Sequence, residues 1–234
     1  MANRIHSTAI IGVGVELGDD NVVGPYTVIV GPTRIGSGNW IAPHVSIGTP
    51  GEYRGGAHPV GWDGELDGTG VLIGDRSVIR EFVTINQGTK ETTVVGDDCY
   101  LLARSHVGHD CVLDRAVTLA DTVQLGGHTQ VGAWANIGMS TVVHQRGRIG
   151  PGAMIGMGSA VRRPVAPFTI AVGNPARVTG VNRVGLSRLG CPDVVVDAFE
   201  EYLKGKADLP ADLPAQLVDE LTAWAKAAAE EVHE

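Results

Sequence analysis

The chain has 234 residues and a formal net charge of −8, so it is long enough for one large domain with an appendage, and its charge argues against a general nucleic-acid partner. Only 5% of its residues are aromatic whereas 33 are glycine, which disfavours a core built on aromatic anchors and favours a repetitive architecture filled by aliphatic side chains. Three scattered cysteines form no disulfide framework, the start MANRIHSTAI contains no apolar signal region, and no apolar run could span a bilayer, so we expect a soluble cytoplasmic protein.

Aliphatic residues recur at every sixth position through most of the chain. The three series are Ile5, Ile11, Leu17, Val23, Ile29, Ile35, Ile41 and Ile47; Ile73, Ile79 and Ile85; and Val95, Leu101, Val107, Leu113, Leu119, Leu125, Val131, Ile137, Val143, Ile149, Ile155 and Val161. A period of six fits neither an α-helix nor a lone strand. It predicts a three-sided prism in which each hexad forms one short strand and turns one corner, so that 18 residues make one coil. Burial of each aliphatic side chain contributes roughly 1.5–3 kcal/mol, and only stacked coils bury them.

Two interruptions of the repeat predict loops, at residues 48–72 and 87–94. The first is glycine-rich and much longer than a usual connection, so we expect it to be functional or mobile.

Beyond the repeat, the pattern becomes helical. One helix is expected to begin near Pro192 and a second near Pro214, because proline favours the first turn of a helix and apolar residues then recur on one face. The two faces consist of Val195, Phe199 and Tyr202, and of Leu217, Leu221, Trp224 and Ala228. We therefore predict a β domain over residues 1–185 and a helical region over 186–234 that flanks the last coil and covers its open edge.

The charges are unevenly distributed. No Asp or Glu occurs between Asp121 and Asp193, although that stretch contains several arginines. These are Arg146, Arg148, Arg162, Arg163, Arg177, Arg183 and Arg188. A stretch with arginines and no acids inside an acidic chain predicts a local site for anions, the alternative being arginines solvated on separate faces.

The unbroken repeat from Val95 onwards places residues 18 positions apart in one column on adjacent coils. His109 then lies under Gly127, with Gln145 above, and Asp110 lies under His128. By the same spacing Gly126 lies beneath His144, and His106 is close by. Several polar groups thus surround Gly127, a position without a side chain.

This constellation suits acyl transfer. A histidine that titrates near neutral pH can act as a general base, and Asp110 can fix the tautomer of His109. The backbone N–H of Gly127 can stabilise an oxyanion, a contribution of ~2.7–4 kcal/mol in other acyl-transfer enzymes. No Ser or Cys motif for a protein nucleophile occurs, so direct transfer in a ternary complex is the simpler mechanism. Two alternatives remain, namely solvated polar residues and a metal site.

The hexads are similar to those of the hexapeptide-repeat acyltransferase superfamily, whose members fold as left-handed parallel β-helices and assemble as trimers. Within it the chain resembles the UDP-N-acetylglucosamine O-acyltransferase family of lipid A biosynthesis, on the segments IGDRSVIREFVTINQGT, SHVGHDC, LGGH, STVVHQ, VGNPA and GVNRVGLSR. The resemblance implies a fold that is mainly β, a left-handed parallel β-helix with a C-terminal helical appendage, and a homotrimer. Residues 51–65 depart from the family's first loop, which touches the sugar, so the resemblance leaves the acceptor open.

Carried over by position, the resemblance implies His109 as the general base, Asp110 as its partner and Gly127 as the oxyanion donor. The other implied substrate-binding residues are His106 and His128 in the sugar pocket, His144 and Gln145 near the acceptor and the pantetheine arm, Asn182 and Arg188 for the nucleotide or the donor, and Met139 beside the acyl chain. A methionine there goes with shorter acyl groups in the family.

The expected function is transfer of an acyl group from acyl carrier protein, or coenzyme A, to a hydroxyl or amine of a nucleotide-activated amino sugar. No tightly bound cofactor or metal is expected, and the partners are the nucleotide sugar and the acyl donor. The alternatives are a coenzyme A-dependent acetyltransferase acting on another small acceptor, and zinc chemistry of the kind that γ-class carbonic anhydrases perform with three histidines on this prism.

Overall fold

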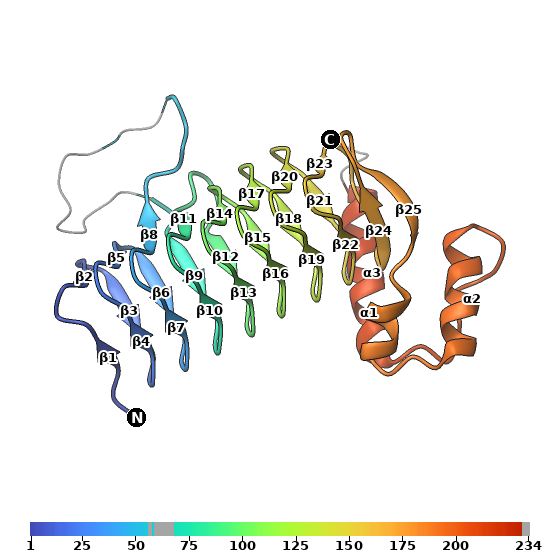
Figure 1. Cartoon of the computed structure of the whole chain (residues 1–234), viewed down its shortest axis with the longest axis horizontal. Helices are drawn as coiled ribbons and strands as arrows, with labels where there is room; N and C mark the ends of the chain where they lie inside the picture. The colour runs from blue at the N-terminus through green and yellow to red at the C-terminus, as the bar shows by residue number, and fades with distance from the viewer. Residues whose placement is uncertain (56–57, 59–67, 231–234) are drawn as a thin grey trace.

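The computed structural model describes residues 1–55, 58 and 68–230, which wind into a three-sided prism with helices at its C-terminal end (Figure 1). Three sheets of ten, eight and seven strands form the faces, here named sheets A, B and C, and they are parallel apart from the last strand of sheet A. The chain visits A, B and C in turn, so that each strand from β1 to β20 pairs with the strand three places later in the chain.

The strands of each face are short, and most are two or three residues long. Sheet A contains β1 (Arg4–Ile5), β4 (Val22–Val23), β7 (Trp40–Ile41), β10 (Val78–Ile79), β13 (Tyr100–Leu101), β16 (Thr118–Leu119), β19 (Asn136–Ile137), β22 (Met154–Ile155), β24 (Thr169–Val172) and β25 (Arg177–Val181). Sheet B contains β2 (Ile10–Ile11), β5 (Val28–Ile29), β8 (Ser46–Thr49), β11 (Thr84–Asn86), β14 (His106–Val107), β17 (Gln124–Leu125), β20 (Val142–Val143) and β23 (Ala160–Val161). Sheet C contains β3 (Val15–Leu17), β6 (Thr33–Ile35), β9 (Val71–Ile73), β12 (Thr93–Val95), β15 (Val112–Leu113), β18 (Gln130–Val131) and β21 (Arg148–Ile149).

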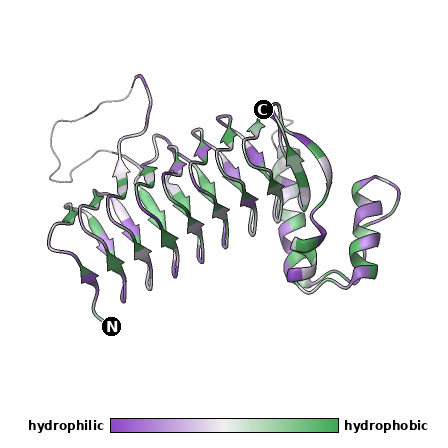
Figure 2. Ribbon diagram, in the orientation of Figure 1, coloured by the Kyte–Doolittle hydropathy of each residue, from purple (hydrophilic) through white to green (hydrophobic). Residues whose placement is uncertain are grey.

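The predicted register is confirmed. In sheet B, Val107 pairs with Leu125, which pairs with Val143, so neighbouring coils are offset by 18 residues. The repeated aliphatic positions point inward, and each of them from Val23 to Val161 is buried. Hydrophobic segments recur in every coil along the prism (Figure 2). Ile5 is 43% exposed because the first coil has no neighbour on its outer side.

Each corner of the prism has two structural requirements, close approach of the next coil and a left-handed backbone residue, and different residues meet them. The glycine that often follows the inward aliphatic residue allows close approach of the next coil: a Cβ on Gly126 would lie 2.6 Å from the backbone nitrogen of Gln145. The left-handed backbone conformation falls instead on residues such as Asp110, His128 and Arg146, with φ of 58°, 60° and 58°. Corner positions can therefore carry functional side chains.

Both interruptions leave the prism at the corner between sheets B and C. The first loop runs from β8 to β9, and its middle lies outside the described residues, so the expectation for residues 48–72 applies only to their described ends. The second runs from β11 to β12 and occupies residues 87–92, two residues fewer than predicted because β12 begins at Thr93. The corner that carries both loops also carries Asp110 and His128.

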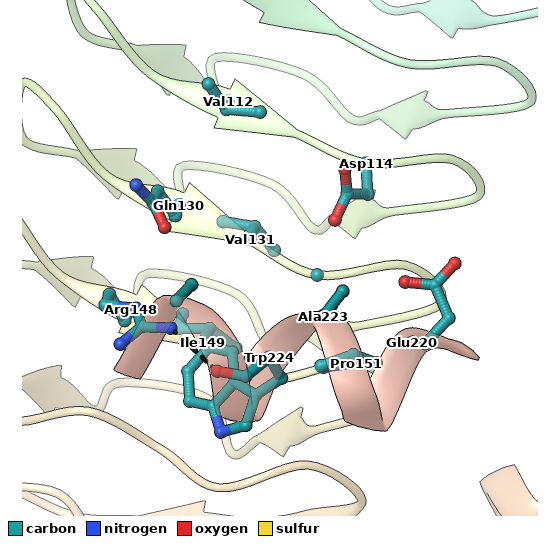
Figure 3. Close-up of a pocket in the computed structure, with 12 residues that line it drawn as sticks. Val112, Asp114, Gln130, Val131, Arg148, Ile149, Pro151, Glu220, Ala223 and Trp224 are labelled. Atoms are coloured by element: carbon teal, nitrogen blue, oxygen red, sulfur yellow. Dashed lines mark hydrogen bonds between the residues drawn. The ribbon is translucent and has the colours of Figure 1, made fainter. Parts of the chain in front are cut away.

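The C-terminal region covers one end and one side of the prism. β25 pairs antiparallel with β24 and ends the parallel ladder. Three helices follow, α1 (Arg183–Arg188), α2 (Asp193–Leu203) and α3 (Ala215–Glu230), and the sequence predicted only the last two. α3 lies along sheet C, where the Arg148 guanidinium stacks 4.2 Å from the centre of the Trp224 ring (Figure 3). The boundary predicted between residues 185 and 186 falls within α1 and stays a prediction.

None of the helices in the described part of the chain is both long and apolar enough to cross a bilayer.

Candidate active site

The column predicted from the repeat exists at the corner between sheets B and C. The backbone N–H of His128 donates to the His109 carbonyl at 2.8 Å, and that of Arg146 donates to the Gly127 carbonyl at the same distance. Asp110, His128 and Arg146 thus lie one above another on successive coils. The sequence predicted Arg146 only as one of the arginines of the anion site, although its position 18 residues after His128 places it in this column.

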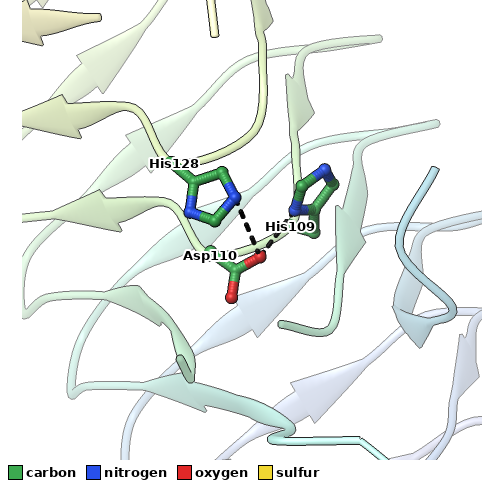
Figure 4. Close-up of side chains that lie close together, drawn as sticks. All are labelled: His109, Asp110 and His128. Carbon is green, nitrogen blue, oxygen red and sulfur yellow. Dashed lines mark hydrogen bonds and ion pairs between the residues drawn. The ribbon is translucent and has the colours of Figure 1, made fainter. Parts of the chain in front are cut away.

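His109 and Asp110 form a close pair. Nδ1 of His109 lies 2.6 Å from Oδ2 of Asp110, whose side chain is only 1% exposed. His128 approaches the same oxygen from the other side, with Nε2 at 3.6 Å (Figure 4). Because an ionised carboxylate only accepts hydrogen bonds, the proton of a neutral His109 lies on Nδ1 and its Nε2 is free to accept another.

The second loop is tied to Asp110. Oδ1 accepts the backbone N–H groups of Thr89, Lys90 and Glu91 at 3.0, 2.7 and 2.6 Å, and Oδ2 accepts the Thr89 hydroxyl at 2.7 Å. Burial acts to raise the pKa of Asp110, but the hydrogen bonds from Glu91, His109, Lys90 and Thr89 outweigh it and hold that pKa well below its usual value. Asp110 is therefore ionised near neutral pH and fixes both the base and the loop.

Gly127 leaves the space that His109 occupies. A Cβ at this position would lie 2.5 Å from both Cε1 and Nε2 of the His109 ring, so any larger residue displaces the imidazole. No described residue accepts a hydrogen bond from the Gly127 backbone N–H. Among the described residues, the Gly127 N–H and Nε2 of His109 thus both remain available to a ligand at this corner.

His106 lies on the outward face of sheet B. Its Nδ1 is 2.7 Å from the Thr84 hydroxyl, and its Nε2 is 3.9 Å from a carboxylate oxygen of Glu52 in the first loop. Burial lowers the pKa of His106 more than Glu52 raises it. His106 is therefore predominantly neutral at pH 7 and acts as a hydrogen-bonding group.

The pKa of His128 is lowered as well. Burial is the main cause, Asp110 acts in the opposite direction, and the charges of Arg146 and Lys90 lower the pKa further. The His128 ring meets His109 edge to face, with 5.1 Å between ring centres.

Two cavities meet at His109. The first, of about 370 Å³ and here named the Gly127 cavity, is lined by residues that include His106, Gly108, His109, Leu125, Gly127 and Val142. The second, of about 490 Å³ and here named the Lys90 cavity, is lined by residues that include Arg54, Lys90, His109, His128, Gln145 and Arg146. Glu52 and His109 line both. The first loop also packs here, since a Cβ on Gly51 would lie 2.9 Å from the His109 Cβ.

Several predicted site residues lie further out. His144 is exposed and lines neither cavity, and its Nδ1 is 2.9 Å from the Gln145 carbonyl oxygen. Met139 is 46% exposed and lies at the corner between sheets A and B, at the opposite end of β20 from His144. Met157 stands one coil above Met139 and is 72% exposed.

Asn182 and Arg188 are not brought to His109 within one chain. Asn182 lies at the corner between sheets C and A, where its Nδ2 donates to the Gly152 carbonyl at 2.8 Å and its Oδ1 accepts the Gly185 N–H at 3.0 Å. It is therefore the N-cap of α1, and Arg188 is exposed in the last turn of the same helix. Neither residue lines the cavities that contain His109.

The arginines of the acid-free stretch do not form one site. Arg148 is buried against Trp224, and Arg183 pairs with Asp197 and Glu200 of α2. Of the seven, Arg146 lines a cavity that contains His109. Arg146 is therefore the one arginine of this stretch that supports the predicted anion site.

Cys111, which follows Asp110 directly, points into the core. Its side chain is fully buried, and burial raises the pKa of its thiol to about 12, so it cannot supply a thiolate nucleophile.

The metal alternative meets a physical obstacle. Ligand atoms of His109, Asp110 and His128 lie within 4.8 Å of one another, a spacing that a metal ion could bridge. However, both oxygens of Asp110 already accept hydrogen bonds from the second loop, and Oδ2 also holds His109. A metal ion would have to break the contacts that fix the imidazole and the loop, so the donor set fits a proton-transfer arrangement.

The chain is similar to known proteins over most of its length, although no protein-family model matches it. It is 34% identical over 220 residues, 85% of this chain and 81% of the relative, to the acyl-[acyl-carrier-protein]–UDP-N-acetylglucosamine O-acyltransferase of Campylobacter concisus. It is 41% identical over 182 residues to the enzyme of the same name from Synechocystis, covering 76% of this chain and 62% of that one. Among solved structures, UDP-N-acetylglucosamine acyltransferase from Campylobacter jejuni superposes with a TM-score of 0.74 at 29% identity, over 89% of this chain and 85% of that one. The expected fold class, a left-handed parallel β-helix with C-terminal helices, is confirmed.

Proposed function

The chain belongs to the UDP-N-acetylglucosamine O-acyltransferase family, and on this premise we propose that it transfers an acyl group from acyl carrier protein to a hydroxyl of UDP-N-acetylglucosamine. The observation that carries the proposal is the position of His109, whose Nδ1 is held by Asp110 while its Nε2 faces the space over Gly127. This is the geometry that a general base needs.

The proposed reaction proceeds without a covalent enzyme intermediate. Nε2 of His109 takes the proton of the acceptor hydroxyl while its oxygen attacks the thioester carbonyl. The carbonyl oxygen becomes an oxyanion and accepts a hydrogen bond from the Gly127 N–H. Collapse of this tetrahedral intermediate breaks the C–S bond, and the protonated His109 returns its proton to the departing thiolate, so that the products are the ester and the free carrier thiol.

The negative charge of Asp110 assists His109 both before and after the proton transfer. It keeps the Nδ1 tautomer in place before the reaction, and it stabilises the imidazolium while His109 holds the proton. His106 and His128 have lowered pKa values, so near pH 7 both are neutral hydrogen-bonding groups beside the base rather than competing cations.

We also propose that the enzyme is a cytoplasmic homotrimer. Asn182 and Arg188 lie away from His109 in their own chain, so they can contact the substrates only from a neighbouring copy. Exposed Met139, Val142 and Met157 form an apolar edge on sheet B that a neighbour and an acyl chain can share. If so, mixing inactive His109→Gln and Arg188→Ala subunits restores part of the activity, whereas independent monomers restore none.

The test of the function is a product analysis. Purified protein is incubated with UDP-N-acetylglucosamine and either acyl carrier proteins of several acyl lengths or acetyl-coenzyme A, and the nucleotide products are identified by mass spectrometry. We expect acylated UDP-N-acetylglucosamine with the carrier protein as the preferred donor. Product from acetyl-coenzyme A on other small acceptors alone, or no acylated nucleotide from either donor, contradicts the proposal.

A further inference from the structure

The two cavities at His109 differ in charge. The Gly127 cavity is lined by Gly108, Leu125 and Val142 together with Glu52, His106 and Gln124, and no described Lys or Arg lines it, whereas the Lys90 cavity is lined by three cationic side chains, from Arg54, Lys90 and Arg146. A reaction between an apolar acyl group and an anionic nucleotide sugar needs such a difference on the two sides of its base.

The cations of the Lys90 cavity have no acidic partner among the described residues. No side chain in the described ranges 1–55, 58 and 68–230 forms an ion pair with Arg54, Lys90 or Arg146, whereas Arg76, Arg115 and Arg183 all pair with carboxylates. Glu52 lines the same cavity, and it lies toward His106, with its carboxylate 3.9 Å from Nε2 of that residue.

The backbone holds two of the cations next to the reacting centre. The Lys90 N–H donates to Asp110 at 2.7 Å, and the Arg146 N–H donates to the carbonyl of Gly127 at 2.8 Å. Both residues are therefore fixed through their main chains to the residues proposed to orient the base and to bind the oxyanion. Their charges also reach His128, whose pKa they lower. The long side chains remain exposed and able to meet a ligand.

The positions of the reacting groups decide which substrate enters which cavity. Gly127, the oxyanion donor, lines the Gly127 cavity and not the Lys90 cavity, so the thioester carbonyl belongs in the former. The acceptor must reach His109 from the other side. We infer that Lys90 and Arg146, with Arg54, form the subsite for the diphosphate of the nucleotide-sugar acceptor. This assignment rests on the proposed function and adds which residues recognise the acceptor.

The test compares the two substrates in one double variant. In Lys90→Met/Arg146→Met, we expect the KM for UDP-N-acetylglucosamine and the Kd for UDP to rise by roughly 10- to 100-fold for each charge-assisted hydrogen bond that the substitutions remove. The KM for the acyl carrier protein donor stays near the wild-type value. Arg34→Met is the matched control, because Arg34 is an exposed arginine that pairs with Glu16 near the other end of the prism.

The outcomes separate this inference from the proposed function. If the double variant keeps the wild-type KM and Kd for the nucleotides, or if the KM of the donor rises instead because its phosphopantetheine phosphate occupies the cavity, the inference is wrong while the acyltransferase function stands. If the wild-type protein neither binds UDP nor acylates UDP-N-acetylglucosamine, the proposed function itself has failed. Unchanged circular dichroism and melting temperature confirm that the variants are folded.

Discussion

Oδ2 of Asp110 lies 2.6 Å from Nδ1 of His109, the residue directly before it in the chain. Neighbouring side chains in a strand point to opposite faces and cannot meet. Here they meet because Asp110 takes the left-handed conformation, with φ of 58°, and the chain turns the corner between sheets B and C at this point. The corner geometry of the prism thus builds the pair that the proposed mechanism requires.

Replacing Asp110 by asparagine tests its role as a positioning residue. An amide cannot accept hydrogen bonds on both of its heavy atoms, so it cannot hold Nδ1 of His109 and all the donors of the second loop together. We expect kcat to fall by up to about 10⁴-fold, the size of the effect when the carboxylate of a catalytic triad becomes an amide. Steady-state kinetics of a folded variant check this, and a kcat close to the wild-type value refutes the assignment.

The same carboxylate makes stability depend on pH. Its pKa in the folded state lies below that in the unfolded chain, where Asp titrates near ~3.9. Its contribution is therefore fully present above about pH 5 and is lost as the pH falls through the folded-state pKa. We expect the free energy of unfolding of wild-type protein to exceed that of Asp110→Asn at pH 7, and the difference to shrink in acid. Urea titrations at a fixed protein concentration measure the free energy of unfolding of the two proteins at each pH. A difference between the two free energies that does not change with pH contradicts the account.

Gly127→Ala probes the space beside the base. The added Cβ would lie 2.5 Å from Nε2 of His109, and the backbone at Gly127 is not left-handed, so we expect the imidazole to move while the fold remains. The imidazole must move by roughly 1 Å to restore an ordinary contact, and a misplacement of about 1 Å costs about 10²-fold in rate. Gly180→Ala is the control, because nothing lies within 4 Å of its added Cβ. Equal kcat values for the two variants count against the predicted arrangement.

Met139 is proposed to limit the length of the acyl chain. Met139→Gly opens space at the corner between sheets A and B, so we expect the preference of the enzyme to shift toward carrier proteins with longer acyl groups. Met157→Gly is a necessary comparison, since Met157 lies one coil further and is more exposed. If the preferred acyl length changes only in Met157→Gly, Met157 is the residue that limits the chain. If it changes in neither variant, neither methionine limits it.

The repeat explains how much of this could be predicted. Within the unbroken hexads the period fixes which residue faces inward and which residues share a column, so the placements of His109, Gly127 and His128 follow from counting. Glu52 and Lys90 could not be found in this way, because they lie in the two loops, where the period stops and the path depends on contacts. The anchor of the second loop on Asp110 is such a contact.

The C-terminal end shows a second limit. The short helix α1 is fixed by two hydrogen bonds of Asn182, a local one from the Gly185 N–H and a long-range one to the Gly152 carbonyl, and neither follows from the hexad period. The acid-free stretch likewise did not show which of its arginines lie together at one site. Composition alone cannot distinguish Arg146, which faces a cavity, from Arg148, which is buried under α3.

The most direct test of the catalytic arrangement is the single-turnover rate of His109→Gln with acyl carrier protein and UDP-N-acetylglucosamine both at saturating concentration. Glutamine keeps hydrogen-bonding capacity but cannot take the proton, so the rate is expected to fall by about 10²–10⁴-fold while UDP still binds and the melting temperature stays near that of the wild type. Transfer within a few-fold of the wild-type rate would show that a different group removes the proton.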